Sequence, residues 1–191
     1  MTNPIIAKKL RLCTWNAGGL MSNVVHLQNC LEKSDICVVQ EHWLYPDSLN
    51  FMATVNANFT GWGRSSNDLN LDSIWRRGKG GIGILWGKSL NPYITKMDDL
   101  GDDRILVIRV KETEGQDIFI VGVYLPSSNC GIDLYRACIE KLEEIVYRLN
   151  DHGTLFIAGD FNAHILGIMV DLEASIRQTT EGENLLMLWI D

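Results

Sequence analysis

The chain has 191 residues, of which 46% are hydrophobic and 21% charged, so it can fill the core of one globular domain. Its net charge of −7 argues against a protein that coats nucleic acid through a general excess of Lys and Arg. The same charge is compatible with an enzyme that meets phosphate through a divalent metal, because the metal supplies local positive charge among acidic ligands.

The cysteines and the apolar segments of the sequence indicate in which cellular compartment the protein is located. The five cysteines are odd in number and contain no C-x-x-C pair, which argues against a disulfide framework or a structural zinc site. The N-terminus lacks the apolar core of a signal peptide, and no apolar run is long enough to span a membrane. We therefore expect an intracellular protein, in nucleus or cytoplasm, without a membrane partner or an obligate protein partner.

The first part of the chain predicts a β-α-β unit. Residues 10–17 form an apolar strand that the Gly18-Gly19 pair ends. Apolar residues at helical spacing predict a helix over 22–34, with Ser22 as its N-cap. Residues 36–41 begin with four apolar residues and predict a second buried strand.

The middle of the chain predicts more strands than helices. Residues 80–86 form a glycine-containing core strand, and 104–110 pairs with 118–125 as a hairpin. A long amphipathic helix follows over 133–149, and 154–158 is a further core strand. Residues 181–190 read as a last helix. These elements predict an α+β fold in which two packed sheets are covered by a few helices.

Polar side chains follow three of the predicted core strands. They are Asn16, Glu41 after Gln40, and Asp160 with Asn162. Polar groups at such positions cost desolvation free energy unless they are paired or hold an ion, so we expect them to share one site at a sheet edge. Asp160 and Asn162 are two residues apart, and on an extended chain their side chains would point the same way. Glu41 supplies a hard oxygen ligand suited to Mg²⁺, or to Mn²⁺ in its place.

The motifs around these residues occur in the order and spacing of a known family. They are Leu12-Cys-Thr-Trp-Asn16, Val38-Val-Gln-Glu41, Gly122-Val-Tyr124-Leu-Pro126 and Ile157-Ala-Gly-Asp160-Phe-Asn162-Ala. Together they resemble the endonuclease/exonuclease/phosphatase superfamily. The segments Lys79-Gly-Gly-Ile-Gly-Ile-Leu and Asp103-Arg104-Ile-Leu-Val look closest to the endonuclease domains of non-LTR retrotransposons. The resemblance implies a DNase I-like two-sheet β-sandwich flanked by helices.

The resemblance also implies a role for each strand-end residue. Glu41 would bind the metal with Asn16 beside it, Asp160 would orient or activate the attacking water, Asn162 would hold the scissile phosphate, and Tyr124 would donate to a phosphate oxygen. Asn162 and Tyr124 are thus both catalytic and substrate-binding. The remaining expected substrate contacts are Arg76, Arg77 and Lys79, which with Arg64 form a basic stretch that is either a solvated loop or a phosphate-facing surface.

Two departures from the family pattern bear on function. Apurinic-site nucleases of the superfamily carry an acidic residue two positions after the strand-one Asn, where this chain has Gly18. The late Asp and the Ser-Asp-His segment of the family do not occur, and His164 is interpreted as a loop residue. We therefore expect residues 1–191 to be a single partial domain, truncated at its C-terminus and lacking its last strands.

Three functions follow from this reading. The first is Mg²⁺-dependent phosphodiester hydrolysis by a DNA-nicking endonuclease of the retrotransposon type. The second keeps the fold and metal but acts as a phosphatase on a small or lipid phosphate. The third is a non-catalytic remnant of a retroelement, which would account for the missing histidine segment.

Overall fold

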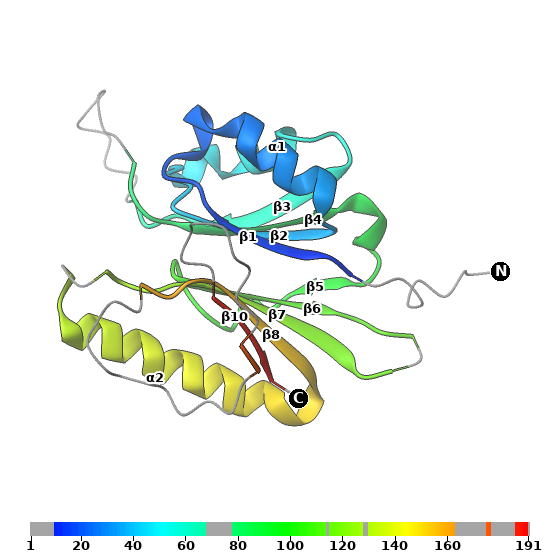
Figure 1. Cartoon of the computed structure of the whole chain (residues 1–191), viewed down its shortest axis with the longest axis vertical. Coiled ribbons are helices and arrows are strands. Elements are labelled where there is room, and N and C mark those ends of the chain that lie inside the picture. Colours follow the sequence, from blue (N-terminus) through cyan, green and yellow to red (C-terminus); the bar gives the residue numbers. More distant parts are fainter. Residues whose placement is uncertain are drawn as a thin grey trace.

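The computed structural model describes residues 10–67, 78–113, 115–127 and 130–162, together with the backbone of 175–176 and 186–190. Two sheets stack face to face, and one long helix covers the outer face of each sheet (Figure 1). These helices are α1 (Val24–Lys33) and α2 (Ile132–Leu149). This is the α+β two-sheet sandwich that the sequence predicts. No helix in the described part of the chain is long and apolar enough to cross a membrane.

The first sheet has the strand order β1-β2-β4-β3. Its strands are β1 (Leu12–Asn16), β2 (Ile36–Gln40), β3 (Phe59–Arg64) and β4 (Ile82–Gly87). β1 and β2 run parallel with α1 between them, which confirms the predicted β-α-β unit. Asn23, not Ser22, occupies the N-cap position of α1, because Ser22 lies in the preceding 3-10 turn η2 (Leu20–Ser22). The longer 3-10 segment η3 (Pro46–Thr54) joins β2 to β3.

The second sheet has the order β5-β6-β7-β8-β10-β9. Its strands are β5 (Ile94–Lys96), β6 (Ile105–Val110), β7 (Asp117–Tyr124), β8 (Gly153–Asp160), β9 (Ser175–Ile176) and β10 (Leu186–Ile190). β6 and β7 form the predicted antiparallel hairpin. β7 and β8 run parallel with α2 as their crossover, which brings their carboxyl ends to the same edge of the sheet.

The prediction of a helix over 181–190 is wrong for its last part. Leu186–Ile190 is strand β10, which pairs antiparallel with β8. A short apolar run fits a helix and a strand equally well by periodicity, and the unpaired backbone groups along the edge of β8 decide between them. Residues 181–185 lie outside the described part of the chain.

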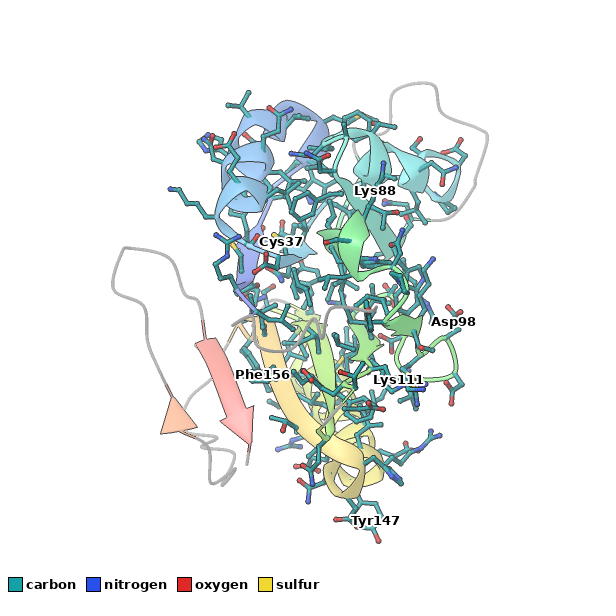
Figure 2. The ribbon with its side chains drawn as sticks, turned by 90° about the vertical axis from the view of Figure 1, so that its right-hand side faces the viewer. Cys37, Lys88, Asp98, Lys111, Tyr147 and Phe156 are labelled. Carbon is teal, nitrogen blue, oxygen red and sulfur yellow. The ribbon has the colours of Figure 1, made fainter. Side chains whose placement is uncertain are left out.

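Alternation along the strands divides the apolar side chains among three layers. In β6, Ile105 and Val107 pack toward α2, whereas Leu106 and Ile108 lie between the two sheets. The third layer lies between the first sheet and α1 and includes Leu27. In Figure 2 the side chains fill the interior of both halves, while Tyr147 points outward from α2. Strands with both faces covered explain the nearly continuous apolar runs of the sequence.

Gly122 sets the distance between the two sheets. It lies in β7 on the face toward the first sheet, and an added Cβ would stand 2.8 Å from Val38 Cγ1 and 3.4 Å from Ile82 Cδ1. The contact with Val38 is the severe one, because a β-branched side chain that is fully buried in a strand has little freedom to rotate away. A glycine is required here by space, not by backbone conformation.

We expect Gly122→Ala to lower the free energy of unfolding by about 1–3 kcal/mol, because overpacking a closed core displaces side chains and backbone. Urea denaturation measures the change. Gly115→Ala is the matched control, since an added Cβ there meets no atom within 4 Å. Equal midpoints for the two variants would show that the sheets are not in close contact at Gly122.

Candidate active site

The ends of four strands meet at one edge of the sandwich, and Asn16 joins them. Its Nδ2 donates to Glu41 Oε1 at 3.0 Å and to Asp160 Oδ2 at 2.9 Å. Asn16 ends β1, Glu41 follows β2, and Asp160 ends β8 of the opposite sheet. The structure therefore brings these three predicted residues together in one hydrogen-bonded group that bridges the two sheets.

The amide of Asn16 is itself oriented by the turn that follows. The backbone N–H of Gly18 donates to Asn16 Oδ1 at 3.1 Å, which leaves Nδ2 to face the two carboxylates. Gly18 has a positive φ of 50°, and an added Cβ would meet no atom within 4 Å. Two carboxylates that share a site repel each other, and a donor between them reduces that repulsion.

Glu41 is aimed into this group by an unusual backbone conformation. It has a φ of 51°, directly after the extended residues of β2, so the chain turns sharply there. Gln40 before it is fully buried and donates from Nε2 to Thr14 Oγ1 at 2.9 Å, which ties the end of β2 to β1. Left-handed φ is uncommon outside glycine, and such positions often occur at functional sites.

His42 is a structural residue under the site. Leu44 N donates to its Nδ1 at 2.9 Å, and its Nε2 donates to Arg64 O at 3.0 Å, which defines a neutral ring. Burial lowers the pKa of His42, although its bonds to the backbone oppose that shift. Gly81 lies against the ring, since an added Cβ would stand 2.5 Å from Nε2. His42 thereby holds the loop before β4 beside the site.

Tyr124 ends β7, and its register partner in β8 is Asp160. Burial is the main cause that raises the pKa of Tyr124. The charge of Glu41, the hydrogen bond between Glu41 and the phenol, and the charge of Asp160 raise it further, whereas the charge of Arg104 lowers it. The phenol therefore stays protonated at neutral pH, and its one O–H group faces the Glu41 carboxylate. This protonation state is the one that its predicted role requires.

The spacing of Asp160 and Asn162 predicts an extended chain at Asn162. The structure shows a turn there instead. β8 ends at Asp160, and Asn162 has a φ of 44°. Its backbone N–H donates to Asp160 Oδ1 at 3.0 Å, and its Nδ2 donates to Leu125 O at 2.8 Å. The side chain thus fastens the turn after β8 to the end of β7. Its binding of the scissile phosphate stays a prediction.

The basic stretch is divided by the structure. Arg64 donates from Nη2 to Asp98 O at 2.7 Å and from Nη1 to Gly101 O at 3.3 Å. Its guanidinium therefore binds the loop between β5 and β6 of the second sheet. Lys79 is exposed, and its backbone is held by the side chain of Asn67. Its neighbour Gly80 adjoins the Tyr124 ring, with 3.6 Å between an added Cβ and Cε1. Arg76, Arg77 and His164 lie outside the described residues.

The donors at the site fit a magnesium ion. Glu41 and Asp160 present two carboxylates on one amide, whereas Asn16 could ligate only through Oδ1, which accepts a hydrogen bond from Gly18 N. In the described ranges, no three His, Cys, Asp or Glu side chains group as a metal site. Mg²⁺ often uses one or two carboxylates and completes its shell with water and substrate phosphate, so this small donor set is suitable.

Comparisons with known proteins agree with this architecture. The profile of the endonuclease/exonuclease/phosphatase family matches residues 13–169. A 3′ phosphatase from Neisseria, NExo, bound to a product DNA hairpin, is 19% identical with a TM-score of 0.55, over 81% of this chain and 58% of that chain. The human Nocturnin catalytic domain with a bound sulfate anion is 12% identical with a TM-score of 0.61, over 98% and 83%.

The endonuclease domain of TRAS1, a telomere-specific non-LTR retrotransposon, is 15% identical with a TM-score of 0.53, over 81% of this chain and 60% of that chain. At such identities these similarities confirm the DNase I-like fold and favour no single relative. The chain spans 58% of the length of the Neisseria structures. No curated protein sequence matches.

We expect Asn16→Ala to lower the free energy of unfolding by about 1–3 kcal/mol, because it removes hydrogen bonds to two charged groups. Asn16→Asp should lower it further, since a third negative charge would face Glu41 and Asp160. Urea denaturation in the presence of a chelator measures both. Asn56→Ala is the control, because Asn56 Oδ1 only accepts an exposed backbone bond from Asn58 N. Wild-type stability in Asn16→Asp would contradict the bridge.

The buried neutral ring of His42 predicts a pH dependence of stability. Its folded-state pKa lies below the ordinary value of 6.5, so the unfolded chain takes up a proton first as the pH falls. This contribution to stability is complete above that ordinary value and is lost as the pH falls toward the folded-state pKa. His42→Gln should flatten the decline between about pH 7 and pH 5 in urea denaturation, and an unchanged decline in this variant would contradict the prediction.

Proposed function

The chain belongs to the endonuclease/exonuclease/phosphatase family, and from this premise we propose that it is a Mg²⁺-dependent phosphodiesterase that nicks DNA, as a retrotransposon endonuclease does. The observation that carries the proposal is the joint hydrogen bonding of Asn16 to Glu41 and Asp160. It brings together Glu41, the proposed metal ligand, and Asp160, the proposed catalytic residue, from the strand ends of opposite sheets.

In the proposed mechanism, Glu41 would hold Mg²⁺ with Asn16 beside it. The bound ion would supply positive charge against the negative charge that develops on the phosphate. Asp160 orients the attacking water and accepts its proton. Its carboxylate is itself oriented, because Oδ1 accepts from Asn162 N and Oδ2 from Asn16 Nδ2. Positioned groups of this kind avoid reorganisation during the reaction.

The phosphate is bound in this proposal by Tyr124 and Asn162. The protonated phenol of Tyr124 donates to a phosphate oxygen, and Asn162 contacts the scissile group from the turn after β8. Hydrolysis by water leaves a 5′-phosphate and a 3′-hydroxyl if a nucleic acid strand is cut. Lys79 supports DNA as substrate, because it is an exposed cation one residue from the glycine that adjoins Tyr124. Arg76 and Arg77 are proposed to extend this contact.

A second candidate is a phosphatase that acts on a small or lipid phosphate. It is favoured by the net charge of −7 and by Arg64, whose guanidinium binds backbone carbonyls and is lost from the basic stretch. We further propose an intracellular location, in nucleus or cytoplasm, from the odd cysteine count without a C-x-x-C pair.

We expect the purified chain to nick supercoiled plasmid with Mg²⁺, to stop when a chelator is added, and to recover with Mg²⁺ or Mn²⁺. Glu41→Gln and Asp160→Asn should each slow nicking by about 10²-fold or more, because preorganised charges contribute strongly to such reactions. Conversion of supercoiled to open-circular plasmid on gels measures the rate.

Glu140→Gln and Asp151→Asn are the matched controls, since both remove an exposed carboxylate outside the site. Nicking that persists in Glu41→Gln and Asp160→Asn would assign the activity to a contaminant or to another site. Phosphate release from inositol phosphates in place of nicking would favour the phosphatase. Absence of both activities would leave the non-catalytic remnant.

A further inference from the structure

Arg104 stands directly beside Tyr124, although sequence reasoning assigned it no role at the site. It precedes β6, and its carbonyl accepts a hydrogen bond from Tyr124 N at 2.8 Å. The next register pair is Ile105 with Val123, so Arg104 lies opposite Tyr124 across the hairpin. Opposed residues of an antiparallel pair share a face, and the Arg104 guanidinium carbon lies 5.4 Å from the centroid of the Tyr124 ring.

The charge of Arg104 has no carboxylate partner in the described part of the chain. The ion pairs found there join other residues, namely Arg11 with Asp35, Arg109 with Asp117, Lys141 with Asp102 and Arg148 with Asp99. The one hydrogen bond of the Arg104 guanidinium to a described residue is a long one, from Nη1 to Tyr124 O at 3.4 Å. Most of its N–H groups are therefore available to a ligand, and the side chain is only half-buried.

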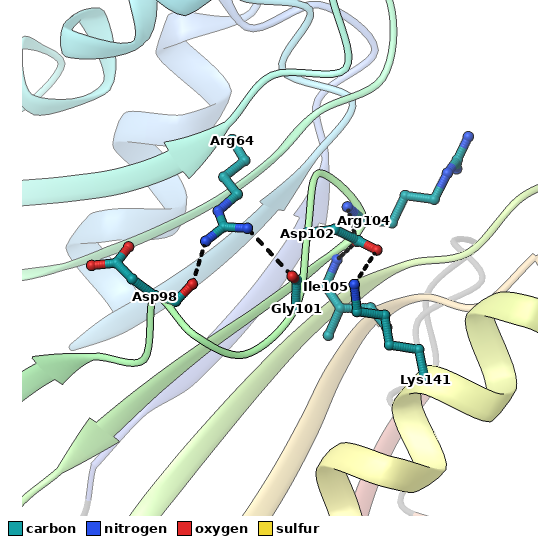
Figure 3. A network of polar contacts seen from close by, with 7 residues as sticks. All are labelled: Arg64, Asp98, Gly101, Asp102, Arg104, Ile105 and Lys141. Carbon is teal, nitrogen blue, oxygen red and sulfur yellow. Dashed lines mark hydrogen bonds and ion pairs between the residues drawn. The ribbon is translucent and has the colours of Figure 1, made fainter.

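The loop before Arg104 is held by hydrogen bonds from β3, β6 and α2, as Figure 3 shows. Arg64, at the end of β3, binds the carbonyls of Asp98 and Gly101. Asp102 Oδ1 accepts from Arg104 N at 2.8 Å and from Ile105 N at 3.1 Å, while Lys141 Nζ of α2 donates to Asp102 Oδ2 at 2.8 Å. This bracing fixes the backbone of Arg104 at the edge where Tyr124, Glu41 and Asp160 meet.

We propose that Arg104 is a phosphate-binding residue of the site, which uses its guanidinium to hold a phosphate-ester oxygen next to the Tyr124 hydroxyl. This inference rests on the proposed function, whose substrate is a phosphate ester. Guanidinium matches phosphate well, because its planar fork donates two parallel hydrogen bonds. The stack on Tyr124 and the braced loop hold the fork in place before the ligand arrives, which lowers the entropy cost of binding.

Binding of inorganic phosphate tests the proposal without turnover. With Mg²⁺ present, calorimetric titration of wild type should show phosphate binding, and Arg104→Gln should weaken the affinity about tenfold to a hundredfold. Arg104→Lys should fall between them, since it keeps the charge without the fork. Arg148→Gln is the matched control, because it removes an exposed cation paired with Asp99.

The result that would overturn the proposal is an equal phosphate affinity in wild type and Arg104→Gln, or no phosphate binding by wild type. Circular dichroism and thermal denaturation of each variant identify a purely structural role. In that case the melting temperature of Arg104→Gln would fall while its phosphate affinity stayed at the wild-type value, which also overturns the proposal. Loss of phosphate affinity in a wild-type-like fold supports it even if the wild type has no hydrolytic activity.

Two further arms separate the sources of the phosphate. In an Asp160→Asn background, Arg104→Gln should reduce the salt dependence of DNA duplex binding by about one phosphate contact if the group belongs to a nucleic acid backbone. If it belongs to a small ester, the salt dependence should stay unchanged while the affinity for inositol phosphate falls. Either result supports the contact, and unchanged binding in both arms overturns it.

Discussion

The carboxamide of Asn16 is the interaction on which the rest of this site depends. Its Nδ2 reaches two carboxylates that come from different sheets, and its Oδ1 is fixed by the backbone of Gly18. Without a donor between them, Glu41 and Asp160 would repel each other across the sandwich. The bridge therefore sets the distance and orientation of both acidic groups, and with them the width of the site between the two sheet edges.

The residues around this bridge lie at the ends of strands, where the extended backbone conformation stops. Glu41 and Asn162 both take positive φ values immediately beyond the ends of β2 and β8. Such conformations cost free energy outside glycine, and the packed sheets on either side supply the stability that maintains them. The sandwich thus fixes the positions of these residues, and the positive φ values at the strand ends set the directions of their side chains.

The sequence predicts the sheets and the residues of the site better than it predicts the local geometry. Short, nearly continuous apolar runs identify β2, β6, β7 and β8, because each strand is covered on both faces. The strand β10 is missed because its pairing with β8 is a long-range effect, which no local pattern contains. The turn at Asn162 is missed for a related reason, since its amide donates to the carbonyl of Leu125, which directly follows β7.

Arg104 and Arg64 show a further limit of sequence reading. Both are arginines at the boundary of a strand, and their sequence surroundings place only Arg64 in the basic stretch. The structure gives Arg64 two carbonyl acceptors and leaves most of the Arg104 guanidinium available beside Tyr124. Which cation serves the loop and which faces the site is decided by how the hairpin of β6 and β7 lies against the first sheet.

The Asn16 bridge also has a consequence for the order of folding. Asn16 and Asp160 are separated by 144 positions along the chain, whereas Asn16 and Glu41 are separated by 25. During synthesis the first sheet can therefore form while Asp160 is still absent, and only half of the acidic pair would be in place. Closing so large a loop is slow, because the entropy of the intervening chain is lost before the contact is gained. The site should thus be among the last parts of the molecule to become competent, after both sheets have formed and docked.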